Sequence, residues 1–186
     1  MAADSLNIIA ATIPATGAAV SAAPLGSTEP TDATSALDGA FIDLGWAGPD
    51  GVINSIKRDT TKHYAWGGEV VKVTQDKYTE TITVTLLESS AEVLEAVFGT
   101  DNVTGTGAVT VEHSSLMLER QMFAFDFIDG DATGRILVRE GQITEIGDIK
   151  YVHDDLTSYE LTIDVFKTGA GDPGVVTFFD SVGGGS

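Results

Sequence analysis

A glycine-rich run near the C-terminus is the first candidate for chemistry. Gly169, Gly171 and Gly174 fit the G-x-G-x-x-G spacing of dinucleotide-binding loops. Such a loop binds a pyrophosphate when a helix begins directly after it, because the helix N-terminus contacts the phosphates. Here the β-branched and aromatic residues 175–179 (VVTFF) follow, which is typical of a strand, and Pro173 interrupts the loop. The run therefore indicates a connector between elements, and we expect no cofactor.

Three aspartates have a spacing at which carboxylates could converge on a cation: Asp126, Asp129 and Asp131. A calcium loop needs several oxygen ligands from one segment, and the closing Glu of the EF-hand pattern is absent. Asp and Gly are also the residues that favour a tight turn. We therefore interpret the segment as a hairpin turn and predict no metal site.

The three histidines, His63, His113 and His153, lie in different predicted elements. A zinc site needs at least three convergent ligands. Ser114 follows His113, but no G-x-S-x-G nucleophile elbow is present. The chain also has no cysteine, which excludes thiol catalysis, thiolate metal sites and disulfides. The sequence predicts no catalytic residues, and we expect a protein that is not an enzyme.

The charge balance excludes two further classes of protein. The 186 residues include 28 acidic and 10 basic ones, which gives a net charge of −18. Binding to nucleic acid or to an anionic membrane depends on Lys and Arg, of which this chain has few. No apolar run approaches the ~20 residues of a membrane span. The first basic residue is Lys57, so the N-terminus lacks the positive region of a signal peptide.

A small basic cluster is unusual against this acidic background. Its residues lie between two predicted strands, 52–56 and 69–74, and are Lys57, Arg58 and Lys62, followed by His63. One interpretation is a solvated loop. The other is a contact loop that meets an acidic patch on another copy of the chain, since complementary charges orient partners. The candidate partners are Asp148, Asp154 and Asp155.

Alternation of residue types predicts a mainly β fold. Within residues 78–87, four threonines point to one face, and the other face carries one glutamate and three apolar residues. The threonines are Thr79, Thr81, Thr83 and Thr85. We expect residues 70–75 to be the hairpin partner of this strand, joined through Asp76 and Lys77. Further strands are expected around residues 123–127, 135–139, 143–151 and 159–165.

One helix is expected over residues 90–98. Ser89 and Glu92 form a capping box, an apolar stripe follows, and Gly99 ends the helix. Turns are expected at residues 48–51, 129–130 and 140–141, where Pro, Asp and Gly gather. The predicted fold is a β-sandwich or barrel-like domain with long hairpins and one short flanking helix.

The two ends of the chain differ from the middle. Residues 1–38 are rich in Ala, Thr, Ser and Pro and contain no aromatic residue. We interpret them as an extended N-terminal arm that becomes ordered against a neighbouring subunit, or as a disordered tail. Residues 39–180 form the β domain, and residues 181–186 are expected to be a flexible glycine-rich tail.

Seven segments between residues 40 and 168 share an ordered pattern of aromatic, glycine and acidic residues. They are residues 44–52 (LGWAGPDGV), 65–71, 78–89, 93–99, 101–104, 129–135 and 158–162. In this order and spacing they resemble the major tail proteins, or tail tube proteins, of siphophages. The likeness is greatest to those of phages that infect actinobacteria.

The resemblance implies a structural virion protein. In that family six copies close a ring around a continuous inner β-barrel, and rings stack into a hollow tube that conducts DNA to the host. The family's contact loop to the adjacent ring falls on residues 57–68, and its N-terminal arm on residues 1–38. The implied partners are other copies of the chain, a tape measure protein, a tail terminator and tail assembly chaperones. Assembly would take place in the host cytoplasm, and DNA would pass without specific binding.

Closed rings agree with the sequence, because long hairpins leave edge strands that pair with another copy. An acidic bore would repel phosphates within a Debye length of ~8–10 Å. We expect the face of Thr79, Thr81, Thr83 and Thr85 to line the bore. Two alternatives remain at this stage: a tube subunit of another injection or secretion system, and a carbohydrate-binding β-sandwich. A hydrolase is the least supported.

Overall fold

The computed structural model describes residues 8–14, 19–105, 107–167, 169, 171 and 173–180. It confirms a mainly β fold with one short α-helix. The elements in chain order are β1 (Val20–Pro24), β2 (Ile42–Asp43), β3 (Ala47–Tyr64), β4 (Val70–Leu86), α1 (Ala91–Phe98), a 3-10 turn η2 (Thr100–Asn102), β5 (Val103–Thr104), β6 (Thr110–Val111), β7 (Gln121–Asp129), β8 (Ala132–Ile146), β9 (Tyr159–Val165) and β10 (Val175–Asp180). The expected tail at 181–186 lies outside the described residues.

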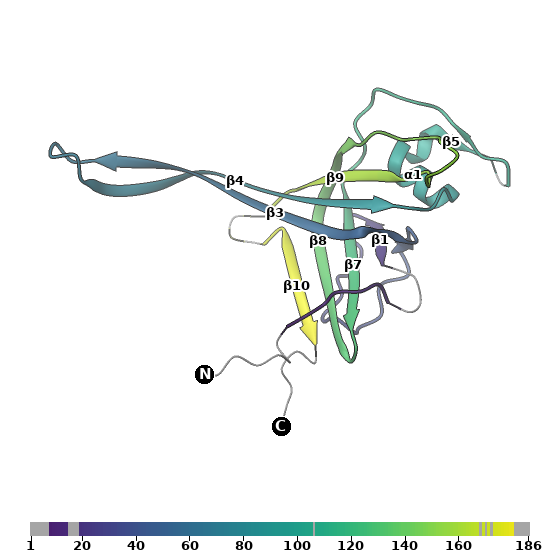
Figure 1. Cartoon of the computed structure of the whole chain (residues 1–186), viewed down its shortest axis with the longest axis horizontal. Coiled ribbons are helices and arrows are strands. Elements are labelled where there is room, and N and C mark those ends of the chain that lie inside the picture. The colour runs from purple at the N-terminus through teal and green to yellow at the C-terminus, as the bar shows by residue number, and fades with distance from the viewer. Residues whose placement is uncertain are drawn as a thin grey trace.

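One antiparallel sheet contains most of the strands. Its order is β2-β1-β7-β8-β9-β4-β3, and β10 pairs with β8 in addition. Strand β8 is shared: its first half pairs with β7 and β10, and its second half pairs with β9. In Figure 1 the strands β7, β8 and β10 run across the direction of β3, β4 and β9. The sheet thus folds over itself, and the two halves enclose the core.

The core lies between these halves and under helix α1. It joins apolar side chains from both halves of the sheet with two from the helix, Val93 and Val97. The sheet contributes Phe123, Phe125, Val138, Leu161, Ile163, Ile82, Val84 and Leu86, each at most 1% exposed. The face of β4 that the alternation assigned to the interior is therefore the buried face.

Helix α1 begins one residue later than the sequence indicated. Ser90, not Ser89, is the N-cap, and its hydroxyl accepts a hydrogen bond from the amide of Val93. Ser89 instead exchanges a hydrogen bond with the hydroxyl of Tyr159 at 3.0 Å. Either serine hydroxyl can accept a hydrogen bond from an amide of the first helical turn. Which serine becomes the N-cap therefore depends on Tyr159, which is distant in the sequence and binds Ser89. The stop at Gly99 is confirmed.

The expected hairpin between residues 70–75 and 78–87 is wrong. Residues 70–86 form one continuous strand, β4, and its partner is β3. Asp59 pairs with Lys77 and Thr60 pairs with Gln75, so Asp76 is an extra residue in the ladder. A bulge of this kind bends a strand without reversing it. The reversal lies instead at residues 65–68, where Gly68 has a φ of 89° and donates to the carbonyl of Ala65.

The turn expected at residues 140–141 is also wrong, because β8 runs through it. Gly141 lies where β8 passes closest to the core. A Cβ there would be 2.8 Å from Cγ2 of Ile163 and 3.0 Å from Phe123 and Val138. The glycine therefore serves close packing within a strand. By contrast, the turn after Asp129 is present, with Gly130 at a φ of 60°.

Part of the N-terminal segment belongs to the main sheet, contrary to its interpretation as an arm. Strand β1 pairs with β7 along five residues and with β2 on its other side. Val20, Ala22 and Ala23 are buried. Strand β1 lies between β2 and β7, so small side chains fill the space there. The segment is therefore ordered although it contains no aromatic residue. Thr12 also bridges to Ile128 of β7.

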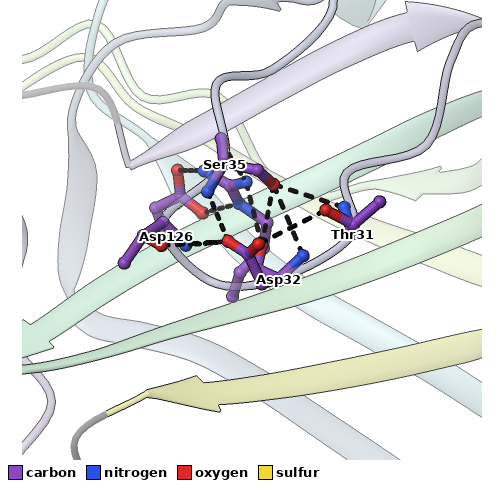
Figure 2. Close-up of polar contacts among 6 residues, drawn as sticks. Thr31, Asp32, Ser35 and Asp126 are labelled. Carbon is purple, nitrogen blue, oxygen red and sulfur yellow. Dashed lines mark hydrogen bonds and ion pairs between the residues drawn. The ribbon is translucent and has the colours of Figure 1, made fainter.

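The loop from residue 25 to residue 41 is fastened to β8 by two arginines. Arg135, which is 5% exposed, donates to both carboxylate oxygens of Asp126 at 2.6 and 2.9 Å and to the carbonyl of Ser35 at 2.7 Å. Arg139 donates to Glu29. Within the loop, the carboxylate of Asp32 accepts from the amides of Thr34 and Ser35 (Figure 2). These contacts hold the loop against the sheet.

Candidate assembly interface

The described residues that were considered for chemistry contact other groups or lie in separate places. Asp126 is paired with Arg135, and Asp129 accepts from the amide of Ala10. His63 lies near Thr74 and His113 packs on Phe98, so the two are in separate places. Among the described residues, no group of three His, Asp or Glu could hold a metal ion. A helix long and apolar enough to cross a membrane is likewise not found in this part of the chain.

The most prominent surface feature is a projecting β-hairpin. Strand β9 pairs with β4 only between Thr81 and Leu86, so β3 and β4 continue together beyond the body of the sheet. We call residues 57–79 the distal hairpin; it extends far from the rest of the molecule in Figure 1. It was expected to be a loop over residues 57–68. It is a hydrogen-bonded ladder, so its side chains have fixed directions.

Two strand edges are left without partners along this hairpin. Strand β3 is the last strand of the sheet order, so no described strand pairs with its outer edge over 18 residues. Beyond the end of β9, no described strand pairs with the second edge of β4, from Val70 to Glu80. Unpaired edges present rows of N–H and C=O groups that readily pair with another chain.

The predicted basic cluster is divided between the two faces of the distal hairpin. Lys57 pairs with Thr79, and His63 lies six residues along on the same face, because side chains alternate. Arg58 and Lys62 point to the opposite face, where the Arg58 guanidinium lies 5.1 Å from the ring centre of Tyr78. The four residues are therefore divided between the two faces of the distal hairpin.

Two more basic residues, which the charge pattern alone did not single out, belong to this hairpin. Lys72 pairs with His63, and Lys77 pairs with Asp59. Residues 57–77 thus contain five of the ten basic residues of the chain and three acidic ones, whereas the rest has five basic against 25 acidic residues. The excess of basic residues in this stretch can be counted in the sequence. It marks one surface only once β3 and β4 are known to pair.

The root of the distal hairpin contains a polar cluster. Glu80 is 7% exposed and accepts hydrogen bonds from Asn54 at 3.0 Å and from the hydroxyl of Tyr78 at 2.6 Å. The hydrogen bond to Glu80 and burial raise the pKa of Tyr78 above its ordinary value. The ammonium of Lys167 lies 4.9 Å from the centre of the Tyr78 ring. These contacts join the hairpin to the body.

The four threonines of β4 lie on the face opposite the core. Thr79 is exposed, and Thr81, Thr83 and Thr85 are half-buried. On the neighbouring strand β9, the residues that pair with Thr81 and Thr85 are Asp164 and Glu160. We call this surface the threonine face. On the body it is bordered by carboxylates, and on the distal hairpin it carries Lys57, Lys72 and Lys77.

The acidic patch lies on the connection between β8 and β9. Asp148, Asp154 and Asp155 are all exposed. Asp148 and Asp155 border a hollow with Thr85 and Glu160, at the end of β4 that is farthest from the distal hairpin. The basic residues and the acidic patch of one copy therefore do not meet within the copy.

A strand edge that stays open over 18 residues is typical of chains that join the sheet of one copy to the sheet of another. The chain belongs to the phage tail tube protein family, because a model of that family matches residues 1–178. It is therefore a structural component of the phage virion and not an enzyme. This assignment favours tube assembly with other copies over the carbohydrate-binding module.

Two solved structures are weakly similar to this chain. One is the cap of the anti-feeding prophage, described as a tube-terminating cap, with 10% identity and a TM-score of 0.45, covering 91% of this chain and 93% of that chain. The other is a sheath–tube complex of an extracellular contractile injection system, PVC, in its extended state, with 11% identity and a TM-score of 0.45, covering 89% and 90%. Scores this low define no shared fold, so the family match alone supports the assignment. No curated protein matches the chain.

Proposed function

We propose that this chain builds the hollow tail tube of a long, non-contractile siphophage tail, with six copies in each ring and rings stacked along the tail. The observation that carries the proposal is the unpaired outer edge of β3 over 18 residues. A head-to-tail contact that closes produces a ring and removes the exposed edges. The number six comes from the resemblance to siphophage tail proteins.

The threonine face is the candidate for the bore. Its four threonines, from Thr79 to Thr85, are short and uncharged, and Glu160 and Asp164 of β9 lie beside them. Phosphates of a passing duplex would be repelled by these carboxylates within ~8–10 Å at physiological salt. Such a wall lets DNA slide without specific binding, and we propose that the genome leaves the particle through it.

Contacts between rings are the proposed task of the basic residues Lys57, Arg58, Lys62 and His63. A first candidate acceptor is the acidic patch of a copy in the next ring, formed by Asp148, Asp154 and Asp155, since the two sets lie at opposite ends of one copy. Exposed ion pairs contribute ~0–1 kcal/mol each, so a single pair has little effect. In a symmetric tube every contact is repeated around each ring, and the small contributions add.

The remaining partners follow from the same proposal. A tape measure protein would fill the tube during assembly, chaperones would deliver subunits in the host cytoplasm, and a terminator would close the end. Residues 8–14, which reach β7 through Thr12, would be the part of the proposed N-terminal arm nearest to a neighbouring subunit.

Negative-stain electron microscopy of the purified full chain tests the proposal. We expect hollow tubes of stacked rings, and six-fold symmetry in averaged end views. A particle that stays monomeric in light scattering at high concentration and forms no tubes would contradict the tube. End views with another rotational order would contradict the hexameric ring while leaving the tube in place.

A further inference from the structure

The end of the distal hairpin presents apolar side chains that have no partner in their own chain. A tight turn fixes the end of the hairpin. The backbone amide of Ala65 donates to the backbone carbonyl of Glu69 at 2.8 Å, and the amide of Gly68 donates to the carbonyl of Ala65 at 2.9 Å. Trp66 in this turn is fully exposed, and Tyr64 and Val71 beside it are 61% and 64% exposed. We call these three residues the hairpin tip. Exposed aromatic and aliphatic groups gathered on one rigid turn are typical of an interaction site.

A groove at the other end of the molecule has the matching chemistry. We call it the helix groove: it lies between the outer side of α1, the turn η2 and the segment of residues 116–119. Leu116 and Met117 on its rim are 80% and 76% exposed. Methionine adapts its shape to a bound group and makes favourable contacts with aromatic rings. The groove therefore suits an aromatic side chain such as Trp66.

The helix groove is formed before anything binds. The side-chain amide of the buried Gln142 donates to the carbonyl of Leu118 at 2.6 Å, which fixes the segment that carries Met117. The side-chain amide of Asn102 donates to the carbonyl of Phe98 at 2.7 Å and holds η2 against the end of α1. A rigid groove and a rigid turn lose little conformational freedom when they meet.

The charges around the two surfaces are complementary. Lys62, His63 and Lys72 lie next to the hairpin tip on β3 and β4. The helix groove is lined by three carboxylates, those of Glu95, Asp101 and Glu119, and by no basic residue. In a chain with a net charge of −18, copies repel one another unless such contacts orient them.

The distal hairpin and α1 lie at opposite ends of the molecule (Figure 1), so one copy cannot join its own tip to its own groove. We propose that the hairpin tip of one copy docks in the helix groove of a second copy, with Trp66 against Met117 and Leu116. The contact is head-to-tail, so it repeats from copy to copy. This proposal deepens the tube function and rests on it.

The acidic patch is the competing acceptor, and the lining of the two sites decides between them. The hollow beside Asp148 and Asp155 contains Lys150, and it borders Thr85 and Glu160 on the threonine face. Four carboxylates and one lysine line this hollow, so its net charge equals that of the helix groove and charge does not distinguish the two sites. The hollow borders the proposed bore, whereas no residue of the threonine face lines the helix groove, so we assign the tip to the groove.

Cysteine cross-linking distinguishes the two acceptors, because the chain has no cysteine of its own. Trp66→Cys protein is mixed with Met117→Cys protein, and in a matched arm with Leu156→Cys protein. All three side chains are exposed, so the variants are expected to fold. After assembly, a short bismaleimide reagent is added and cross-linked species are measured on a denaturing gel, with electron microscopy of the same samples.

We expect cross-linked dimers from the Trp66→Cys and Met117→Cys mixture, and at least a ten-fold lower yield from the Trp66→Cys and Leu156→Cys mixture. Tubes that show the reverse preference, or tubes with no cross-link between positions 66 and 117, would overturn the docking proposal alone. Failure of the wild-type chain to form tubes would overturn the tube function and, with it, the docking. Charge exchange gives a second readout: Glu119→Lys should reduce assembly, and Lys62→Glu in the second partner should restore it.

Discussion

Single residues determine how closely the two halves of the sheet can approach. Gly141 lies in β8 at the point where this strand begins to pair with β9, and Phe123, Val138 and Ile163 surround the position of its absent side chain. A methyl group there requires three buried side chains to move. The folded body thus depends on the absence of a side chain as much as on the apolar groups around it.

Gly141→Ala is therefore expected to lower the free energy of unfolding by about 1–3 kcal/mol through overpacking. Urea unfolding of the monomeric chain measures this change. Gly39→Ala is the matched control, because nothing lies within 4 Å of a Cβ at that position. Its free energy of unfolding should stay within about 0.5 kcal/mol of the parent value. Equal effects from the two substitutions would contradict the packing role of Gly141.

Asp32 should make the loop that covers β8 sensitive to acid. Hydrogen bonds from the amides of Thr34 and Ser35 lower the pKa of Asp32 below its ordinary value of 3.8. A lowered pKa in the folded state means that the charged carboxylate stabilises the loop above about pH 3.8, and that this contribution is lost as the pH falls through the lowered pKa. The NMR chemical shifts of the Thr34 and Ser35 amides should change together with pH, with a common midpoint below 3.8.

The NMR titration has a direct control in Asp32→Asn, which keeps hydrogen-bond acceptors but carries no titrating group. In that variant the two amide signals should no longer respond to acid. A midpoint at or above the ordinary value of 3.8 in the parent chain would show that the hydrogen bonds to Asp32 do not form in solution.

At the scale of elements, we expect strand β1 to be needed for folding and the residues before it, 1–18, not to be needed. Among the described contacts, removal of residues 1–18 takes away the bridge between Thr12 and Ile128, the hydrogen bond from Ala10 to Asp129 and the packing of Ile13 against the core, but leaves the pairing of β1 with β7 intact. Removal of residues 1–24 also exposes the core around Phe123 and Phe125, because β1 pairs along this part of β7. We expect the shorter truncation to fold and the longer one to unfold.

Burying Val20 alone contributes about 1.5–3 kcal/mol, a large part of a total stability of ~5–15 kcal/mol. Circular dichroism during heating measures the outcome for both truncations. A cooperative transition in the chain that lacks residues 1–24 would contradict the structural role of β1. Loss of that transition in the chain that lacks residues 1–18 would show that the first residues are needed for folding.

The distal hairpin should be needed for assembly and not for folding. Arg58 pairs with Tyr78, so the residues between them can be replaced by Asn-Gly, which favours a two-residue hairpin turn. The side chains that are removed are almost all exposed, so the melting temperature should change little. Tubes should disappear in electron micrographs. Normal tubes from the shortened chain would contradict every contact that we assign to the hairpin.

At the scale of the whole molecule, the charges are distributed unequally. The distal hairpin is the only described region in which basic residues outnumber acidic ones over a long stretch, and it projects from a strongly acidic body. Copies can therefore attract one another in one orientation although the net charge of each is −18. Assembly should depend on where a charge lies more than on the total.

Lys62→Glu and Lys150→Glu test this dependence on position, because both change the net charge equally. Lys62→Glu is expected to shorten tubes and slow their growth, since each ring loses several contacts of ~0–1 kcal/mol. Lys150→Glu, in the hollow of the acidic patch, should have a much smaller effect. Tube lengths in micrographs and light scattering over time give the comparison. Equal effects would mean that net charge alone governs assembly.

The local patterns were sufficient for several features. Alternation assigned the buried face of β4, an apolar stripe predicted α1 with its stop at Gly99, and Asp129 and Gly130 predicted a turn. The absence of cysteine and the scattered histidines argue against a reactive site from composition and spacing alone. These features depend on neighbouring residues in the sequence, and the sequence therefore contains their full signal.

Only the tertiary structure decided which strands pair and which faces meet. The pairing of β3 with β4 and the place of β1 in the sheet were not predictable locally. The bulge at Asp76 shows the reason, because one unpaired residue shifts the register of everything beyond it. Pairing is chosen by the total burial that distant segments achieve together, and no short stretch of residues records that total.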